Sequence, residues 1–402
     1  MNDIVFDPSD PDTMKDPYES FDRLRSTCPV FHGDRAWYLS RYEEVREASR
    51  DPKLGRYHKQ GAKAMFTWYG AEGMDESSKQ LVDGLFLRDG PEHRRLRRLV
   101  NPHFTPQGIA WLLPGIRSYV ERELGRLRAL KRFDIVGELF TILPSEVVSM
   151  HIGVPQQDRA LLRGTIEAGV RNSDAFIPAD IKVQMEEAYA TLHRYFGDVL
   201  AQANSADSTP LTASIIDGVS DGTISKDEGN ALLTTIYLAG SETTGQTLGN
   251  GLLALLSNRD EWQKLCENPE LAASCVEESL RFDSPSQTFF RSALRDFELN
   301  NEQIREGEFV ISLPGAANRD PEAYPEPDKF KVERFTDVAV PRVMSFGGGA
   351  HSCLGASLAR LEGEVVFTAL SQQLPGMHLV TDAPKRLEKF NTRGLAELWV
   401  EV

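Results

Sequence analysis

The sequence has few cysteines and no long apolar run. Its four cysteines, Cys28, Cys266, Cys275 and Cys353, are scattered, and no C-x-x-C pair occurs. These features exclude a disulfide scaffold, a cysteine-rich zinc site and c-type haem attachment. No stretch reaches the roughly 18 to 20 apolar residues of a membrane-spanning helix, and the acidic N-terminus does not resemble a signal peptide. The sequence therefore predicts a soluble cytoplasmic protein.

Positive charge is also scarce. The 402 residues include 45 Lys+Arg against 60 Asp+Glu, a net charge of −15, so the chain as a whole should repel nucleic acid and anionic membranes. A hydrophobic fraction of 41% and a charged fraction of 26% are typical of a folded protein. At about 150 residues per domain the length would allow two or three domains. Because no repeat or long linker divides the chain, we expect a single domain over residues 1–402.

Hydrophobic spacing predicts mostly helices. Helices are expected at 91–101, at 115–130 and from Ser225, where S-x-x-E forms a capping box, to about Leu256. Several glycines in the last of these argue against a smooth helix. Towards the C-terminus the pattern changes to short strands at 292–299 and 308–313, an irregular segment at 314–346 and a final helix at 354–373. The fold class is therefore predicted to be mainly α with a minor β part.

The segment SFGGGAHSCLGASLAR, residues 345–360, is the most informative. Its glycines permit unusual backbone angles and close approach, and Cys353 follows them just before the final helix. A helix N-terminus stabilises a thiolate, which suits a metal ligand. A buried structural cysteine fits the residues about equally well. A phosphate loop and a dinucleotide-binding loop do not fit, because the lysine and the third glycine that they need are missing.

This segment resembles the haem-binding signature of the cytochrome P450 family. The matching positions are Phe346, Gly347, Gly349, His351, Cys353 and Gly355. The resemblance implies the P450 fold, a single domain with a long helix on the distal side of haem b (iron protoporphyrin IX). It also implies that the Cys353 thiolate is the axial iron ligand, with Phe346 beside it and backbone N–H groups around the sulfur.

Other motifs of the family occur in the expected order. Glu278 and Arg281, at i and i+3 on one helix face, together with Arg334 resemble its structural ion network, although the proline that usually precedes the second arginine is absent. Four residues align with positions that bind the haem propionates: His93, Arg97, Arg291 and His351. Each alone would be read as an ordinary surface residue, whereas the set is expected to be cofactor-binding.

The predicted long helix contains Ala239-Gly-Ser-Glu242-Thr243-Thr244, which resembles the family's distal segment. Small residues leave room beside the haem, and a threonine hydroxyl can bond back to a carbonyl and open the helix. Glu242 and Thr243 are the expected catalytic pair, an acid and an alcohol that deliver protons during O₂ activation. Without the cysteine signature, the same residues would be read as a bent core helix with an exposed glutamate.

The resemblance implies a monooxygenase that inserts one atom of O₂ into a hydrophobic small molecule. Its electrons would come from a separate ferredoxin or flavodoxin-type donor with its reductase, docked near the basic residues Arg94, Arg95 and Arg98; an ordinary solvated helix face is the alternative for these. Expected substrate contacts lie in the loops at 56–88 and 168–185 and at four positions: Phe86, Ile236, Ala239 and Phe289.

Two other functions are compatible with the same scaffold. One is a peroxide-driven peroxygenase or a non-oxygenating member of the family. The other is a haem-binding sensor without turnover. The presence of both Glu242 and Thr243 argues against each, because these residues matter for proton delivery to O₂ chemistry.

Overall fold

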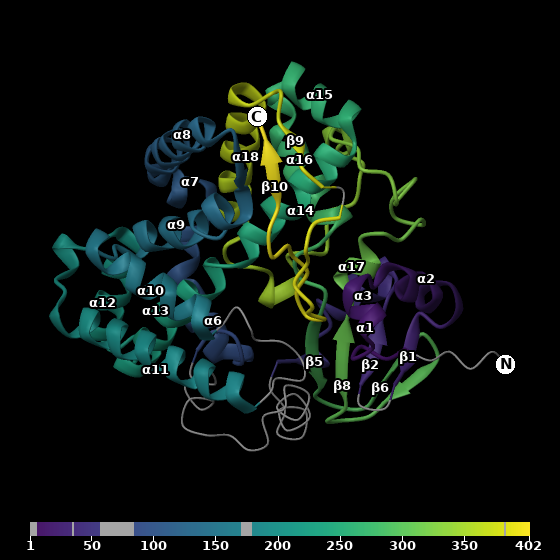
Figure 1. Ribbon diagram of the computed structural model, residues 1–402. Helices are drawn as coiled ribbons and strands as arrows, with labels where there is room; N and C mark the ends of the chain where they lie inside the picture. Colours follow the sequence, from purple (N-terminus) through teal and green to yellow (C-terminus); the bar gives the residue numbers. More distant parts are fainter. Residues whose placement is uncertain (1–5, 34–35, 57–83, 170–178, 382) are drawn as a thin grey trace.

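The computed structural model describes residues 6–33, 36–56, 84–169, 179–381 and 383–402. Helices dominate, and the largest sheet lies at one side of the molecule (Figure 1). This confirms the predicted fold class. Within these ranges no helix combines the length and the apolar character that crossing a membrane requires.

A five-stranded sheet lies beside the N-terminal helices. Its order is β1 (Val30–His32), β2 (Trp37–Leu39), β8 (Phe309–Ser312), β5 (Phe289–Ala293) and β3 (Leu54–Gly55). Only β2 and β8 run parallel, and the antiparallel register of β5 pairs Arg291 with Val310. Four short helices accompany the sheet: α1 (Pro11–Lys15), α2 (Tyr18–Thr27), α3 (Tyr42–Ala48) and α17 (Pro314–Ala317). The sheet thereby holds Arg291 in a rigid buried strand.

The prediction of one strand over 292–299 is wrong. The chain leaves the sheet after Ala293 and forms a separate hairpin of β6 (Phe297–Leu299) and β7 (Glu302–Ile304). Asn300 and Asn301 form the turn of this hairpin, with φ angles of 51° and 65° that a tight hairpin turn needs and asparagine tolerates. The strand predicted at 308–313 agrees with β8.

Most helices lie on the other side of the molecule. Those predicted at 91–101 and 115–130 are α6 (Gly90–Val100) and α8 (Leu113–Leu130). Around them lie α7 (Pro106–Ile109), α9 (Leu143–Ile152), α10 (Gln156–Gly169), α11 (Ala179–Gln202) and α12 (Pro210–Ser220). α15 (Arg259–Glu267) lies apart from these helices, at the top of the view in Figure 1. A three-stranded sheet, in the order β4 (Arg132–Asp134), β10 (Trp399–Glu401), β9 (His378–Leu379), attaches the C-terminus to the end of α8.

The predicted long helix is two helices, α13 (Lys226–Gly240) and α14 (Thr243–Ser257). The capping box is present, since Glu228 N–H donates to the Ser225 hydroxyl at 3.1 Å and Ser225 N–H donates to the Glu228 carboxylate at 2.8 Å. The interruption falls at Ser241 and Glu242, where Glu242 has φ −122° and ψ −51°. The helix expected from Ser225 to about Leu256 is thus divided at this point, in line with the expectation that it would not be smooth.

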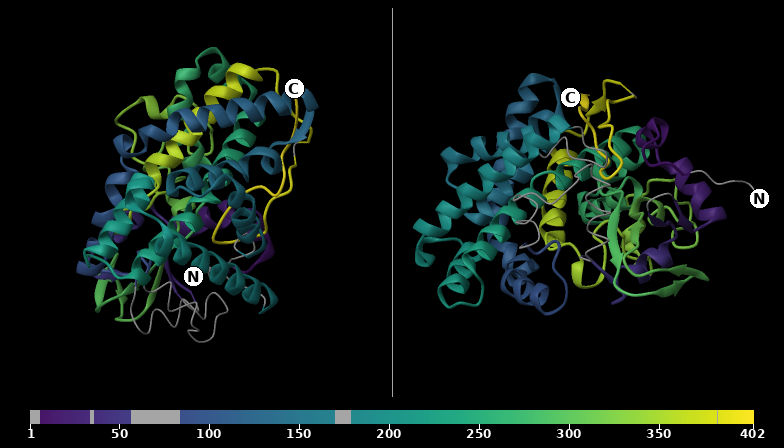
Figure 2. Two further views of the ribbon diagram at one scale, coloured as in Figure 1. Left: turned by 90° about the vertical axis from the view of Figure 1, so that its left-hand side faces the viewer. Right: turned by 90° about the horizontal axis from the view of Figure 1, so that it is seen from below.

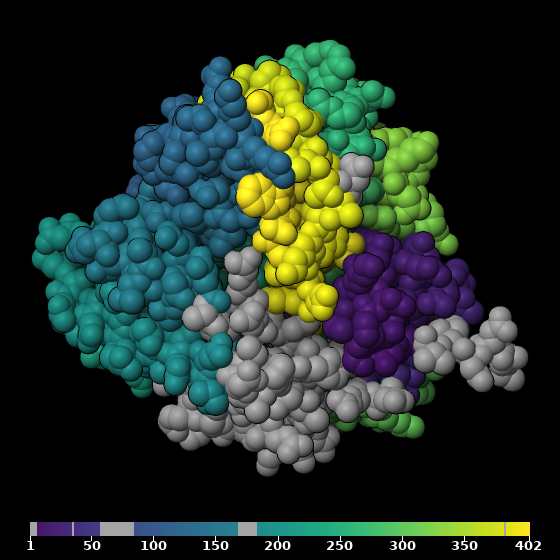
Figure 3. Space-filling model, viewed as in Figure 1, coloured from purple at the N-terminus to yellow at the C-terminus, as the bar shows by residue number. Residues whose placement is uncertain are grey.

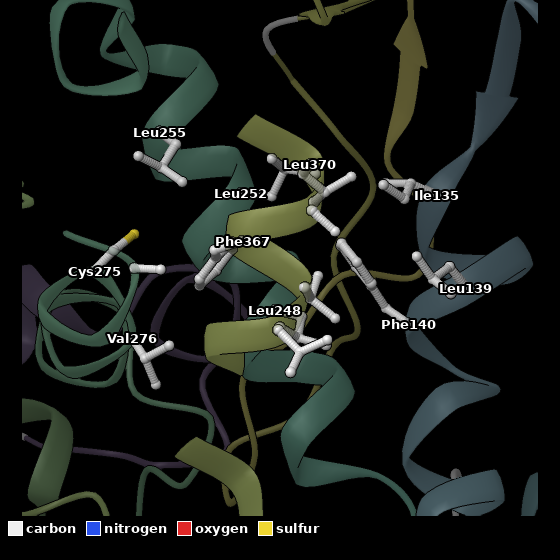
Figure 4. Close-up of a cluster of buried hydrophobic side chains, with 14 of the residues drawn as sticks. Ile135, Leu139, Phe140, Leu248, Leu252, Leu255, Cys275, Val276, Phe367 and Leu370 are labelled. Carbon is white, nitrogen blue, oxygen red and sulfur yellow. The ribbon is translucent and has the colours of Figure 1, made fainter. Parts of the chain in front are cut away.

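The core is built where α14, α16 (Ala272–Phe282) and α18 (Ala356–Gln373) meet. Figure 4 shows Leu248 and Leu252 of α14 beside Phe367 and Leu370 of α18, with Cys275 of α16 nearby. Seen from below, α18 lies between the helical side and the strands (Figure 2, right). On the surface, the C-terminal segment separates the blue and teal helices from the purple N-terminal ones (Figure 3). This packing holds α18, and the cysteine segment before it, in the middle of the fold.

Candidate functional site

The cysteine segment is a tightly bonded loop. Cys353 N–H donates to the Phe346 carbonyl at 2.8 Å, across a turn that includes a short 3₁₀ helix at Gly349–His351. Gly347 and Gly349 have φ angles of 62° and 67°, and a Cβ on Gly349 would clash with the backbone carbonyl of Ser49. Glycine is therefore required here both by conformation and by close packing. The helix itself begins three residues after the cysteine, at Ala356.

Cys353 lies deep in the protein, and its side chain is accessible only because it borders a large internal cavity. Burial raises the pKa of its thiol, and the Gly355 N–H and the positive charge of Arg97 lower it only in part. The loop alone thus favours the neutral thiol, and a cation bound to the sulfur would be needed to hold the thiolate. Phe346, beneath the guanidinium of Arg360 at 4.5 Å, lines the same cavity, as do Gly347 and Gly355.

The cavity encloses about 1730 Å³, its open mouth included. A large, mostly apolar cavity with a few polar groups in its wall is typical of a small-molecule or cofactor site. All four residues predicted to touch substrate, Phe86, Ile236, Ala239 and Phe289, line it. Further apolar side chains in its wall are Leu85, Phe104, Val148, Leu232, Leu280, Met344, Leu354 and Leu358. Residues 57–83 and 170–178 of the predicted substrate loops lie outside the described residues.

The four predicted propionate-binding residues, His93, Arg97, Arg291 and His351, also line this cavity. The His93 and His351 rings lie 4.1 Å apart, and burial lowers the pKa of His93 to about 4. Burial likewise lowers the pKa of Arg291 to about 10. Among the described residues neither Arg97 nor Arg291 forms an ion pair, and the buried Nε2 of His93 lacks a hydrogen-bond partner. Buried cations and a free donor beside Cys353 fit the carboxylates of haem.

Two further residues near this group were missed by the sequence analysis. Arg56 lines the cavity with its guanidinium 4.5 Å from the Phe86 ring. Asp89 accepts hydrogen bonds from the Arg56 N–H and from His351. The position of Asp89 just before a predicted helix was a usable signal. Arg56 begins the loop 56–88 that was expected to contact substrate, but no motif singles it out.

The break between α13 and α14 faces the cavity. Ala239, Gly240 and Thr243 line it, and the Thr243 hydroxyl lies 3.5 Å from the Ala239 carbonyl, to which it donates. The Ser241 hydroxyl donates to the Tyr237 carbonyl at 2.6 Å. Both side chains compete for backbone acceptors of the preceding turn, which accounts for the local opening of the helix.

Glu242 points to the other side of the break. It lines a second pocket, of about 570 Å³, that Thr243 does not share. Its carboxylate accepts hydrogen bonds from Gln246 at 2.7 Å and from Lys389 at 3.3 Å. The predicted acid–alcohol pair is therefore adjacent in sequence, but its two members face different cavities.

The predicted ion network is assembled and buried. Both carboxylate oxygens of Glu278 bind the Arg281 guanidinium, at 2.7 and 2.8 Å, and Arg334 Nε lies 3.0 Å from the same group. Arg281 and Arg334 also donate to backbone carbonyls of the segment 318–329. The network thereby ties α16 to the chain that leads into the cysteine loop.

The basic patch on α6 is smaller than predicted. Arg95 pairs with Glu228 and donates to the Thr223 carbonyl, so it serves the start of α13 and is not free for a partner. Arg94 and Arg98 are exposed and lie four residues apart on one face. The patch around these positions is therefore reduced to two residues.

Comparisons with known proteins agree with this geometry. The family model "Cytochrome P450" matches residues 174–375. The vitamin D(3) 25-hydroxylase of Pseudonocardia autotrophica is 33% identical, over 96% of this chain and 93% of that protein. The biotin biosynthesis cytochrome P450 of Bacillus subtilis is 30% identical over 96% of each. The crystal structure of CalO2 superposes with a TM-score of 0.90 at 33% identity, covering 99% of this chain and 98% of that one.

Members of this family bind haem b, and a cavity lined by a cysteine, by Arg97 and Arg291 and by apolar side chains fits that group. The length of the match and the identity over nearly the whole chain leave one assignment. The protein belongs to the cytochrome P450 family, as a haem-binding monooxygenase.

Proposed function

We propose that this monooxygenase oxidises a hydrophobic small organic molecule with electrons from a separate ferredoxin or flavodoxin-type protein. The observation that carries the proposal is a single cavity lined by the Cys353 thiol, by Arg97 and Arg291, which form no ion pair among the described residues, and by apolar side chains. Residues 1–402 would form one haem domain. When bound, haem supplies the reductive activation of O₂ that leaves one oxygen atom in the substrate and the other in water.

The residues around the cavity divide the work of binding haem. Cys353 would ligate the iron through its thiolate, with the Gly355 N–H directed at the sulfur. His93, Arg97, Arg291 and His351 would bind the propionates. Phe346, Gly347 and Gly355 would shape the floor, and Glu278, Arg281 and Arg334 would fix the segment that precedes it.

Protons would enter from the side of Glu242. The smaller pocket around this carboxylate is lined by polar side chains, Thr141, Ser145, Arg163, Glu167, Ser241 and Gln246, which can order water. Thr243 holds its hydroxyl in the main cavity. A proton would thus pass through the helix break from Glu242 to Thr243, so that the acid stays outside the substrate space.

The substrate would lie against Phe86, Ile236, Ala239 and Phe289. Their apolar surfaces favour a hydrophobic molecule. The electron donor would dock at Arg94 and Arg98, since α6 also carries the cavity residues His93 and Arg97 and since an acidic partner suits a local basic patch.

A screen of the purified haem-loaded protein tests the substrate class. Hydrophobic compounds should shift the haem absorption towards the high-spin form, and hits should be turned over with O₂, ferredoxin and its reductase. Arg94→Glu combined with Arg98→Glu should slow reduction by ferredoxin without changing the spin shift. Arg194→Glu, an exposed charge reversal on α11, serves as the control. Turnover that is equally fast with peroxide alone would contradict the dependence on a donor.

A further inference from the structure

Asp89 immediately precedes α6, but its carboxylate does not cap that helix. An aspartate at this position usually accepts hydrogen bonds from N–H groups of the first turn, a contact worth roughly 0.5–2 kcal/mol. Asp10 does so before α1, where it accepts from Thr13 N–H at 2.9 Å. Asp89 departs from that rule, because its carboxylate accepts hydrogen bonds from other parts of the chain.

The two oxygens of Asp89 join three separate segments. Oδ2 accepts the backbone N–H of Arg56 at 2.6 Å, and Oδ1 lies 2.8 Å from Nε2 of His351. The end of β3, the start of α6 and the cysteine loop are thereby held by one side chain. Arg56 and His351 both line the main cavity, and His351 lies two residues before Cys353.

A carboxylate here cannot act by attracting the haem propionates, because its charge would repel them. Arg56, Arg97 and Arg291 bring three positive charges to the cavity wall, and Asp89 offsets one of them. The remaining two match the two negative propionates. The Asp89 carboxylate therefore acts through the two groups it contacts, the Arg56 backbone and the His351 ring.

Its bond to His351 suits that role. With Nε2 fixed on Asp89, the other ring nitrogen, Nδ1, is left for a ligand and makes no hydrogen bond to any residue in the described ranges. The imidazole of His93 lies 4.1 Å away and also has a nitrogen without a partner. Partners of this kind orient the groups that bind a cofactor and restrict them to one rotamer.

We infer that Asp89 is a positioning residue for haem, which holds His351 and the Arg56 backbone in the arrangement that binds the propionates. The inference rests on the proposed function, because that function assigns His351 and the arginines to haem. Asp89 itself is assigned no contact with haem.

The rate of haem transfer from the holoenzyme to excess apomyoglobin tests the inference. Asp89→Ala should release haem on the order of tenfold faster than wild type, and His351→Ala should do the same. The double variant should be no faster than the faster single one, because both changes remove one interaction. Asp89→Asn, which keeps the shape but not the charge, should fall between wild type and Asp89→Ala.

A matched control removes a genuine helix cap. Asp10→Ala should lower thermal stability and leave the haem transfer rate unchanged, since Asp10 does not line the cavity. An unchanged rate in Asp89→Asn, or rates that multiply in the double variant, would overturn the inference. Wild-type protein that gives no thiolate spectrum with carbon monoxide would instead overturn the proposed function, whatever the Asp89 variants do.

Discussion

The charge network at Glu278 allows a quantitative prediction. Glu278 and Arg281 are fully buried, and the Glu278 carboxylate accepts bonds from two guanidinium groups and from the Lys331 N–H at 2.8 Å. Glu278→Gln keeps the volume but leaves two buried cations without their counter-ion. Breaking a buried pair in this way costs about 3–5 kcal/mol. The free energy of unfolding of a native protein is about 5–15 kcal/mol in total, so the variant should lose a large part of its stability.

Urea unfolding of the haem-loaded protein, followed by circular dichroism and by haem absorption, measures this loss. Glu326→Gln is the matched control, because Glu326 lies in the same region but is exposed and pairs with Lys329 and Lys331. Its loss should cost far less than that of Glu278, because exposed ion pairs contribute little to stability. If Glu278→Gln costs no more than Glu326→Gln, the network is not the anchor of the cysteine segment.

Three further variants test other parts of the structure. Thr243→Ala should bind haem but divert electrons to peroxide; product that still equals the reducing equivalents consumed would refute its role. Gly245→Ala should lower the free energy of unfolding by about 1–3 kcal/mol, because the new Cβ would overlap the Phe140 carbonyl. Gly164→Ala on α10 is the control: its Cβ would contact no other atom, so the variant should not be destabilised. Burial raises the pKa of Glu362, so the native protein binds the Glu362 proton more tightly than the unfolded chain does. The free energy of unfolding of wild type should therefore fall as pH rises above about 4.3, the pKa of an unperturbed glutamate. Glu362→Gln should abolish that slope, and an unchanged slope would contradict it.

Much of the fold was predictable from local patterns. The capping box at Ser225 gives the start of α13, and the apolar spacing of 115–130 gives α8 nearly to the residue. The opening of the helix by a threonine hydroxyl was expected from the sequence, but the part that the Ser241 hydroxyl plays in the break was not, because spacing permits such bonds without requiring them. The hairpin turn at Asn300 was missed, although two adjacent asparagines are a turn signal.

The site was predictable where a motif carries it. Residues such as Cys353 and Arg97 stand at fixed spacings, and the structure brings them to one cavity. The partners that orient them come from distant segments, as Asp89 does for His351, 262 positions away. The opposite facing of Glu242 and Thr243 likewise follows from the helix break and not from their adjacency. Contacts of this kind depend on tertiary packing, which a single sequence does not display.

The central claim is that Cys353 is the ligand of haem iron. The reduced protein with carbon monoxide measures this directly, because thiolate ligation gives a haem band at unusually long wavelength. Wild type should show that band, and Cys353→Ala should lose it. A Cys353→Ala protein that keeps the long-wavelength band unchanged would contradict the account.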